Sequence, residues 1–139
     1  MKYQFEVAGG DFSHAGFVSI EIKKIMKRLH LPPAFIRKLS IANYEAEVNI
    51  IAHAYDGVVD LEITQEKITT TFTDRGPGIA SIQDAMQEGF STASDKVREM
   101  GFGAGMGLPN MKRNSDSMEI HTKQNEGTIV ILSHMVPIA

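Results

Sequence analysis

The sequence predicts an α+β fold in which helices cover one face of a mixed, mostly antiparallel sheet. Two observations predict this architecture. Apolar residues recur at helical spacing in two long segments of the amino-terminal half, and they alternate with polar residues in shorter segments elsewhere. Most of the alternating segments follow one another through short turns, and strands joined in this way pair antiparallel. Because 139 residues with 42% hydrophobic content suit a single core, we expect one domain spanning residues 1–139.

A short strand and an amphipathic helix are expected first. Apolar residues from Tyr3 to Val7 alternate with polar ones, which predicts an edge strand. Ser13 is a candidate cap for the following helix, in which apolar residues recur at helical spacing from Val18 to Leu29. Lysine and arginine side chains occupy the opposite face of this helix. We interpret that face as a solvated surface, because the chain carries a formal net charge of −3.

A second helix and a pair of strands are expected next. Pro32-Pro33 ends the first helix and can begin the second, since proline is tolerated in a first helical turn. The second helix runs to about Tyr55, and Asp56-Gly57 is typical of a turn. Alternating residues over 59–63 and 68–72 then predict two paired strands.

The last part of the chain combines a long loop with a helix and a hairpin. Residues 76–107 are rich in glycine and small polar residues, with a helical pattern only over 82–86. A stretch of this length without regular structure is uncommon in a compact domain, which favours a functional lid. Residues 108–114 are expected to form a helix, and residues 118–123 and 128–133 a final hairpin.

Composition excludes several classes of protein. The absence of cysteine excludes disulfide scaffolds, thiolate zinc sites and thiol redox chemistry. The acidic net charge argues against a nonspecific nucleic-acid binder. Residues 1–7 alternate in polarity where a signal peptide would need a continuous apolar stretch, and no run approaches the roughly 18 apolar residues of a membrane span. We therefore expect a soluble cytoplasmic protein.

A polar column marks the second predicted helix. Glu45, Asn49 and His53 are four residues apart and share a face, which Val48 borders. Burying a carboxylate is costly unless something pairs with it, and the chain does not obviously supply a partner. A bound ion would serve, because Asn49 offers the neutral oxygen that suits Mg²⁺ shared with phosphates, while Glu45 could accept a proton. The alternative is a solvated helix face.

A second candidate segment follows the strand over residues 68–72. Asp74 lies on the side of the strand that Phe72 buries, so a carboxylate ends an inward-facing row. The glycines of the next residues, Arg75-Gly76-Pro77-Gly78-Ile79, would let backbone pass close to a ligand. Asp74 could then accept a hydrogen bond from an exocyclic amine. The alternative is an ordinary Asp-x-Gly turn.

The third candidate segment is glycine-rich and leads into a helix. In residues 101–108, Gly-Phe-Gly-Ala-Gly-Met-Gly-Leu, a glycine stands at every second position. The free N–H groups and the dipole at a helix amino terminus bind phosphate. A dinucleotide fingerprint is rejected because residues 93–100 are charged and do not resemble a strand, and a P-loop because no Gly-Lys-Ser/Thr follows. A flexible hinge is the alternative.

Together these segments resemble the N, G1, G2 and G3 boxes of the GHKL ATPases. The matching motifs are, in order, Glu45-x-x-x-Asn49-x-x-x-His53, Asp74-x-Gly76-x-Gly78-Ile79, Gly103-x-Gly105-x-Gly107-Leu108 and Gly127-Thr128. Residues 49–54, 88–92 and 107–113 further resemble the branch of anti-sigma factors and serine kinases. The resemblance implies a Bergerat fold, ATP and Mg²⁺ as ligands, and a protein partner such as an anti-anti-sigma factor or a sigma factor. The sequence is compatible with a homodimer as well as with a monomer.

The resemblance also implies a role for each matching residue. Glu45 matches the base that orients a substrate serine, and Asn49 matches the Mg²⁺ ligand. Asp74 matches the adenine contact, and Thr128 matches the residue that completes the adenine pocket through water. A packed core histidine is the alternative for His53. The nucleotide-binding residues expected on this basis are Asn49, His53, Asp74, Gly76, Gly78, Ile79, Gly103, Gly105, Met106, Gly107, Leu108 and Thr128, with Lys96 or Arg98 of the lid as the candidate contact to the terminal phosphate.

Three functions are weighed on this basis. The first is a protein-serine kinase that phosphorylates a small anti-anti-sigma-like partner through Glu45. The second is a nucleotide-gated module that sequesters a sigma factor or another regulator without transfer. A detached histidine-kinase catalytic domain ranks third, because no upstream helix offers an exposed histidine followed by an acidic residue as a phosphoacceptor.

Overall fold

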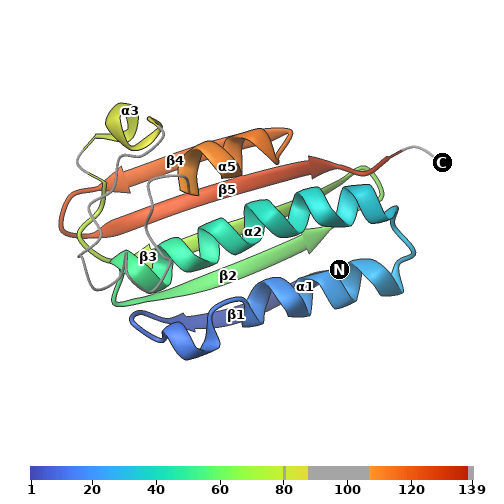
Figure 1. Cartoon of the computed structure of the whole chain (residues 1–139), viewed down its shortest axis with the longest axis horizontal. Helices are drawn as coiled ribbons and strands as arrows, with labels where there is room; N and C mark the ends of the chain where they lie inside the picture. Colours follow the sequence, from blue (N-terminus) through green and yellow to red (C-terminus); the bar gives the residue numbers. More distant parts are fainter. Residues whose placement is uncertain (80, 88–106, 138–139) are drawn as a thin grey trace.

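The computed structural model describes residues 1–79, 81–87 and 107–137 and confirms the α+β fold. A five-stranded sheet carries helices α1, α2 and α5 side by side over one face (Figure 1). The helices span Phe17–Arg28 (α1), Pro33–His53 (α2), Ile82–Ala85 (α3) and Gly107–Arg113 (α5), with a 3₁₀ turn at Phe12–His14. The strands span Lys2–Ala8 (β1), Asp56–Ile63 (β2), Lys67–Arg75 (β3), Ser117–Lys123 (β4) and Gly127–Met135 (β5).

The strand order is β1-β2-β3-β5-β4, and all four neighbouring pairs of these strands are antiparallel. The described sheet is therefore antiparallel throughout, where a mixed sheet was expected. The reason is the helical hairpin between β1 and β2: α1 runs away from the end where β1 finishes and α2 returns to it, so β2 starts there and runs the opposite way (Figure 1). The expectation that β1 is an edge strand is confirmed.

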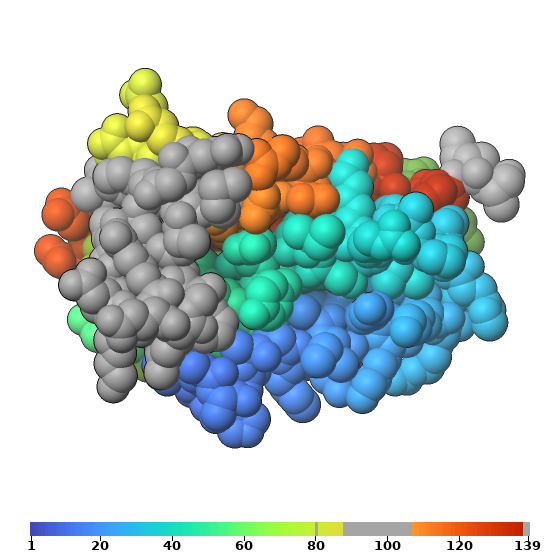
Figure 2. Space-filling view, in the orientation of Figure 1, coloured from blue at the N-terminus to red at the C-terminus, as the bar shows by residue number. Residues whose placement is uncertain are grey.

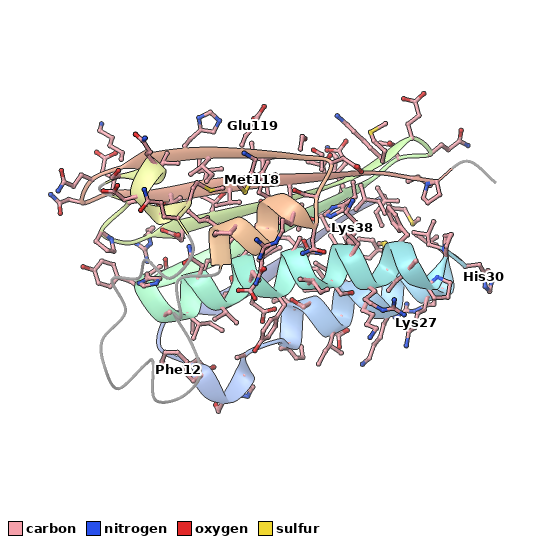
Figure 3. All side chains as sticks on the ribbon, turned by 45° about the horizontal axis from the view of Figure 1, so that its top comes forward. Phe12, Lys27, His30, Lys38, Met118 and Glu119 are labelled. Atoms are coloured by element: carbon pink, nitrogen blue, oxygen red, sulfur yellow. The ribbon has the colours of Figure 1, made fainter. Side chains whose placement is uncertain are left out.

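A row of apolar side chains crosses the sheet beneath the helices. Val59 of β2 lies opposite Phe72 of β3, and Phe72 lies opposite Val130 of β5. All three are buried. Neighbouring residues of a strand face opposite sides, as β4 shows: Met118 points toward the helical layer and Glu119 points away from it (Figure 3).

Helix α2 is the centre of the helical layer. On the face shown in Figure 2 it lies between α1 and α5. Its inner side buries Ile36 and Ile50, and α1 adds Ile22 and Met26, which are fully buried. The basic residues of α1 are exposed as expected, and Lys27 points away from the core (Figure 3). Within the described ranges, no helix combines the length and apolar character needed to cross a membrane.

The expected cap of α1 at Ser13 is wrong. Ser13 lies in the 3₁₀ turn, and α1 begins after Gly16, whose φ of 93° favours glycine. The carboxylate of Glu47, buried on α2, takes the place of the cap. It accepts hydrogen bonds from the N–H groups of Gly16 (3.0 Å), Val18 (3.2 Å) and Ser19 (2.9 Å), and from the Ser19 hydroxyl (2.7 Å). A negative charge at this end also suits the helix dipole.

The expected turn at Asp56-Gly57 is also wrong, because both residues belong to β2. Gly57 is needed inside the strand, since a Cβ there would lie 2.9 Å from side-chain carbons of Ile50 on α2. Asp56 forms an ion pair with Arg75, directly opposite on β3. The chain turns earlier, immediately after α2 ends at His53.

We predict that Glu47→Gln destabilises the fold, because the amide replaces one acceptor oxygen with an NH₂ group facing backbone donors. The free energy of unfolding should fall by about 2 kcal/mol, the scale for losing a hydrogen bond to a buried charged group. Urea denaturation at neutral pH measures this change. Glu62→Gln, on an exposed position of β2, is the control and should stay within about 0.5 kcal/mol of the wild type. Equal stability of the two variants would contradict the capping function of Glu47.

Candidate functional site

The polar column of α2 is half-buried: Glu45, Asn49 and His53 all have intermediate exposure. It is therefore not the fully solvated helix face that was the alternative. Burial lowers the pKa of His53, which favours the neutral imidazole. Within the described ranges, the side chains of Asn49 and His53 have no hydrogen-bond partner, so their polar atoms are available to a ligand or to water.

Glu45 connects α2 to α5. Its Oε1 accepts a hydrogen bond from Nδ2 of Asn110 at 3.3 Å, and the two residues are 65 positions apart in the chain. Its Oε2 faces Gly107, the first residue of α5, where a Cβ would lie 3.6 Å from that oxygen. The chain thus supplies a partner for this carboxylate, contrary to the expectation from the sequence.

Asp74 lies near the end of β3, and β5 holds its carboxylate. Oδ1 accepts a hydrogen bond from the N–H of Thr128 at 3.1 Å. Burial raises the pKa of Asp74; the Thr128 N–H acts in the opposite direction, and the nearby charge of Asp56 raises the pKa further. The other carboxylate oxygen has no hydrogen bond to the described residues, and it can accept one from a ligand.

Thr122 joins this site although no sequence motif marks it. On β4 it lies opposite Thr128 of β5, and the two hydroxyl oxygens are 2.9 Å apart. The Thr122 hydroxyl also accepts a hydrogen bond from the N–H of Ile79 at 2.8 Å. It therefore ties the loop after Asp74 to the strand pair that carries Thr128. The only signal for Thr122 is the register between β4 and β5.

The glycines around Asp74 let segments of the chain approach one another closely. A Cβ on Gly76 would lie 3.0 Å from Cα of Ala54, just after α2. Gly78 has a φ of 78°, and a Cβ there would lie 2.6 Å from a backbone oxygen of β4. Gly127 is the tightest, since its φ is 145° and a Cβ would lie 2.1 Å from the Asp74 carbonyl oxygen. Packing of the chain against itself therefore accounts for these glycines before any ligand is considered.

The described parts of the three candidate segments, which are the polar column of α2, residues 74–79 and residues 107–108, meet near the carboxyl end of α2 (Figure 1). The Cβ position of Gly76 is 3.4 Å from the carbonyl oxygen of His53, and Glu45 lies against Gly107. The amide oxygen of Asn49 suits Mg²⁺, and the free carboxylate oxygen of Asp74 suits an amine.

Leu108, also expected at the site, is buried in the core. Outside the described residues lie the remaining predicted positions, Lys96, Arg98, Gly103, Gly105 and Met106.

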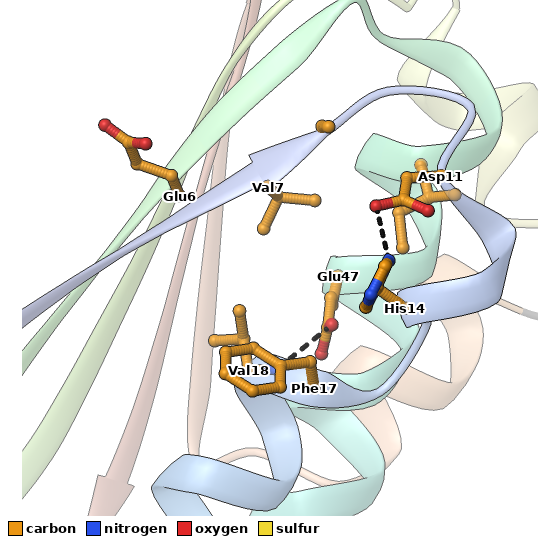
Figure 4. Close-up of a pocket in the computed structure, with 9 residues that line it drawn as sticks. Glu6, Val7, Asp11, His14, Phe17, Val18 and Glu47 are labelled. Carbon is orange, nitrogen blue, oxygen red and sulfur yellow. Dashed lines mark hydrogen bonds and ion pairs between the residues drawn. The ribbon is translucent and has the colours of Figure 1, made fainter.

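A separate hollow lies between β1, the 3₁₀ turn and α1 (Figure 4), and its empty volume of about 280 Å³ includes open solvent. Glu47 lines it, together with apolar residues such as Val7, and Asp11 pairs with His14 at 2.8 Å beside it. None of the predicted site residues lines this hollow. Since the Glu47 carboxylate is already occupied by the donors of α1, we place the candidate site at the end of α2 instead.

A family model for histidine kinase-like ATPase domains matches residues 14–134. The chain belongs to this family. The match spans all four motifs, from Glu45 to Thr128, and confirms the resemblance to the GHKL ATPases.

Curated relatives of the chain include anti-sigma F factors. One from Caldanaerobacter subterraneus is 32% identical over 106 residues, which cover 73% of this chain and 71% of the relative. Another from Clostridium perfringens is 24% identical over 123 residues, 84% of each chain. These similarities confirm the resemblance to the anti-sigma branch.

Solved structures share the fold at low sequence identity. One holds the RsbU and RsbW domains of a Mycobacterium tuberculosis protein; it matches all of this chain with a TM-score of 0.67 at 15% identity, and this chain spans 34% of its length. The SiaB-SiaC complex from Pseudomonas aeruginosa matches 96% of this chain with a TM-score of 0.58 at 10% identity, over 89% of the chain compared. At these identities the structures support the fold alone.

We predict that Gly127→Ala disrupts the contact between β5 and Asp74. The added Cβ would meet the Asp74 carbonyl oxygen at 2.1 Å, so the free energy of unfolding should fall by more than about 2 kcal/mol. Gly10→Ala is the matched control, because its φ of 78° also disfavours alanine but nothing lies within 4 Å of the Cβ position. That variant should lose about 1 kcal/mol. Thermal denaturation compares them, and a smaller loss in Gly127→Ala than in Gly10→Ala would contradict the proposed contact.

Proposed function

We propose that the chain binds Mg-ATP and acts as a regulatory serine kinase of the anti-sigma type, phosphorylating a serine on a small partner protein. The observation that supports this most is the position of Glu45, a half-buried carboxylate against the first residue of the helix that follows the glycine-rich segment. Phosphorylation of a serine asks for a base beside the bound phosphates. The relatives named anti-sigma F factors support a regulatory partner.

The residues of the site fit a nucleotide. Asp74 has one carboxylate oxygen free for the exocyclic amine of adenine, while the N–H of Thr128 holds the other. We propose that Thr128 completes the adenine pocket by contacting adenine through a water molecule. We assign the phosphates to backbone N–H groups around Gly105, which lies outside the described residues, and Gly107, because glycine has no side chain that would keep a phosphate from its amide.

Asn49 is the proposed ligand of Mg²⁺. Its amide oxygen is a hard, neutral donor, and a carboxylate at this position would repel the triphosphate. The side chain is half-buried without a hydrogen-bond partner in the described ranges, one helical turn from Glu45. Such a side chain gains a partner when a metal ion and its phosphates are present.

Glu45 handles the proton in the proposed reaction, for which bound ATP supplies the phosphoryl group. Its carboxylate accepts the proton of the partner's serine hydroxyl, so the serine O–H bond breaks. The serine oxygen then bonds to the terminal phosphorus as the bond between that phosphorus and the β–γ bridging oxygen breaks, and ADP leaves. The protein contributes mainly position and charge stabilisation, with the base adding a further factor.

The alternative function is a nucleotide-gated module that sequesters a sigma factor or another regulator without transfer. The name of the curated relatives favours it, because that name speaks of opposing a sigma factor and not of catalysis. In this case ATP would govern a stable complex, and Glu45 would be dispensable for it.

Transfer of labelled terminal phosphate from Mg-ATP in host lysate tests the kinase. We expect a serine-labelled protein with the wild type and at least about a hundredfold less label with Glu45→Ala, while both bind ATP within about twofold of each other. Glu66→Ala, exposed between β2 and β3, is the control and should label normally. Full labelling by Glu45→Ala would disprove the base, whereas tight ATP binding without any labelling would favour the binding module.

We predict that ATP binding weakens at low pH through Asp74. Burial raises the pKa of Asp74, and only the ionised carboxylate accepts a hydrogen bond at both oxygens. The protein should therefore bind ATP with its full affinity well above this pKa and lose affinity as the pH falls through it. The loss should begin at a higher pH than it would for an aspartate with an ordinary pKa. Asp74→Asn should bind at least about tenfold more weakly at neutral pH and lack this dependence. Fluorescent-nucleotide titrations measure both, with circular dichroism to confirm folding; identical pH profiles would contradict the assignment.

Removal of the magnesium ion tests Asn49 separately. Wild-type affinity for ATP should fall when Mg²⁺ is chelated, whereas Asn49→Ala should bind ATP equally with and without Mg²⁺. Isothermal titration calorimetry measures both. A full magnesium dependence in Asn49→Ala would show that another residue holds the ion.

A further inference from the structure

We propose that Asn110 is a positioning residue that orients Glu45 for proton transfer, with Arg113 holding Asn110 in place. This inference rests on the proposed kinase function. Nδ2 of Asn110 donates to Oε1 of Glu45 at 3.3 Å, and Oδ1 of Asn110 accepts from Nη2 of Arg113 at 2.5 Å. A single amide therefore links α2 to the last turn of α5.

Charge determines which way the Asn110 amide points. A guanidinium can only donate hydrogen bonds and an ionised carboxylate can only accept them. Turning the amide over would place its NH₂ against Arg113 and its oxygen against Glu45, so both contacts would become repulsive. The NH₂ group of Asn110 therefore points toward Glu45 and donates to its carboxylate.

Packing and hydrogen bonds also hold the backbone of Asn110 in place. The residues on either side, Pro109 and Met111, are buried, and Met111 has no exposed surface. The Asn110 carbonyl accepts hydrogen bonds from the backbone N–H of Asn114 at 3.1 Å and from its side chain at 2.9 Å. A side chain on such a rigid segment can fix the orientation of its partner.

The consequence is that the two oxygens of Glu45 are not equivalent. Oε1 is held by Asn110, whereas Oε2 is directed toward Gly107, where the glycine-rich segment ends. The oxygen nearer the expected phosphates is therefore the one left to accept the serine proton. Without Asn110, the carboxylate would rotate among orientations that do not direct an oxygen there, and transfer would slow although ATP still bound.

Asn110→Asp tests this proposal most sharply, because it keeps the size of the side chain and its contact with Arg113 but removes the donor to Glu45. We expect the turnover number for transfer to fall at least about tenfold, with the dissociation constant for ATP within about twofold of the wild type. Gln65→Glu, the same change from amide to carboxylate at an exposed position between β2 and β3, is the matched control and should transfer normally. Transfer by Asn110→Asp at the wild-type rate would overturn the proposal.

A second measurement reports on the geometry without any transfer. In ¹⁵N–¹H spectra of the unliganded protein, the side-chain amide signals of Asn110 should shift in Glu45→Gln, while those of Gln65, exposed between β2 and β3, should not. Unchanged Asn110 signals would overturn the positioning contact. A shift in a protein that labels no partner would instead preserve the contact and refute the kinase function on which its catalytic use rests.

Discussion

The helical layer depends on two carboxylates that α2 directs to opposite sides, Glu45 toward α5 and Glu47 toward α1. Residues two apart on a helix lie about 200° apart around its axis, so one helix can hold a neighbour on each flank. Glu47 is buried and caps the amino end of α1, while Glu45 is half-buried and accepts from Asn110. The orientation of α2 therefore sets both the entry of α1 and the place of α5 beside the site.

A second constraint operates at the end of β3, where three segments meet around Asp74. Gly127 has no Cβ, so β5 can pass against the Asp74 carbonyl, and Thr128 can then donate to the carboxylate. Thr122 fastens the following loop to the same strand pair. The described contacts reach only one oxygen of the Asp74 carboxylate, so the second oxygen is free to accept a hydrogen bond. Burial also raises the pKa of Asp74, because it disfavours the charged form. That combination is typical of a ligand-binding group and unusual for a purely structural one.

The regular elements were predictable because periodicity records burial directly. The structure contains β2 and β3 where residues alternate over 59–63 and 68–72, and α1 where apolar residues recur at helical spacing from Val18 onward. The errors occurred where a long-range contact overrode a local signal. Ser13 is a residue type that often caps helices, but Glu47, 31 residues after Gly16, caps α1 instead. Asp56-Gly57 has the sequence of a common turn, but Gly57 lies inside β2 because a side chain there would collide with Ile50 of α2.

The sequence by itself determined the order of strands and helices, the polar column on α2 and the order of the three glycine-containing motifs that follow it, since each is a pattern of neighbours along the chain. Only the tertiary structure decided that Glu45 belongs to the candidate site and that Glu47 caps α1. Glu45 and Glu47 lie two residues apart in the same helix, and only their partners, 65 residues onward for one and 31 residues back for the other, distinguish a carboxylate at the candidate site from one that caps a helix. Asn110 and Thr122 likewise acquire their places from packing and register, because a hydrogen bond depends on distance in space and not on separation along the chain.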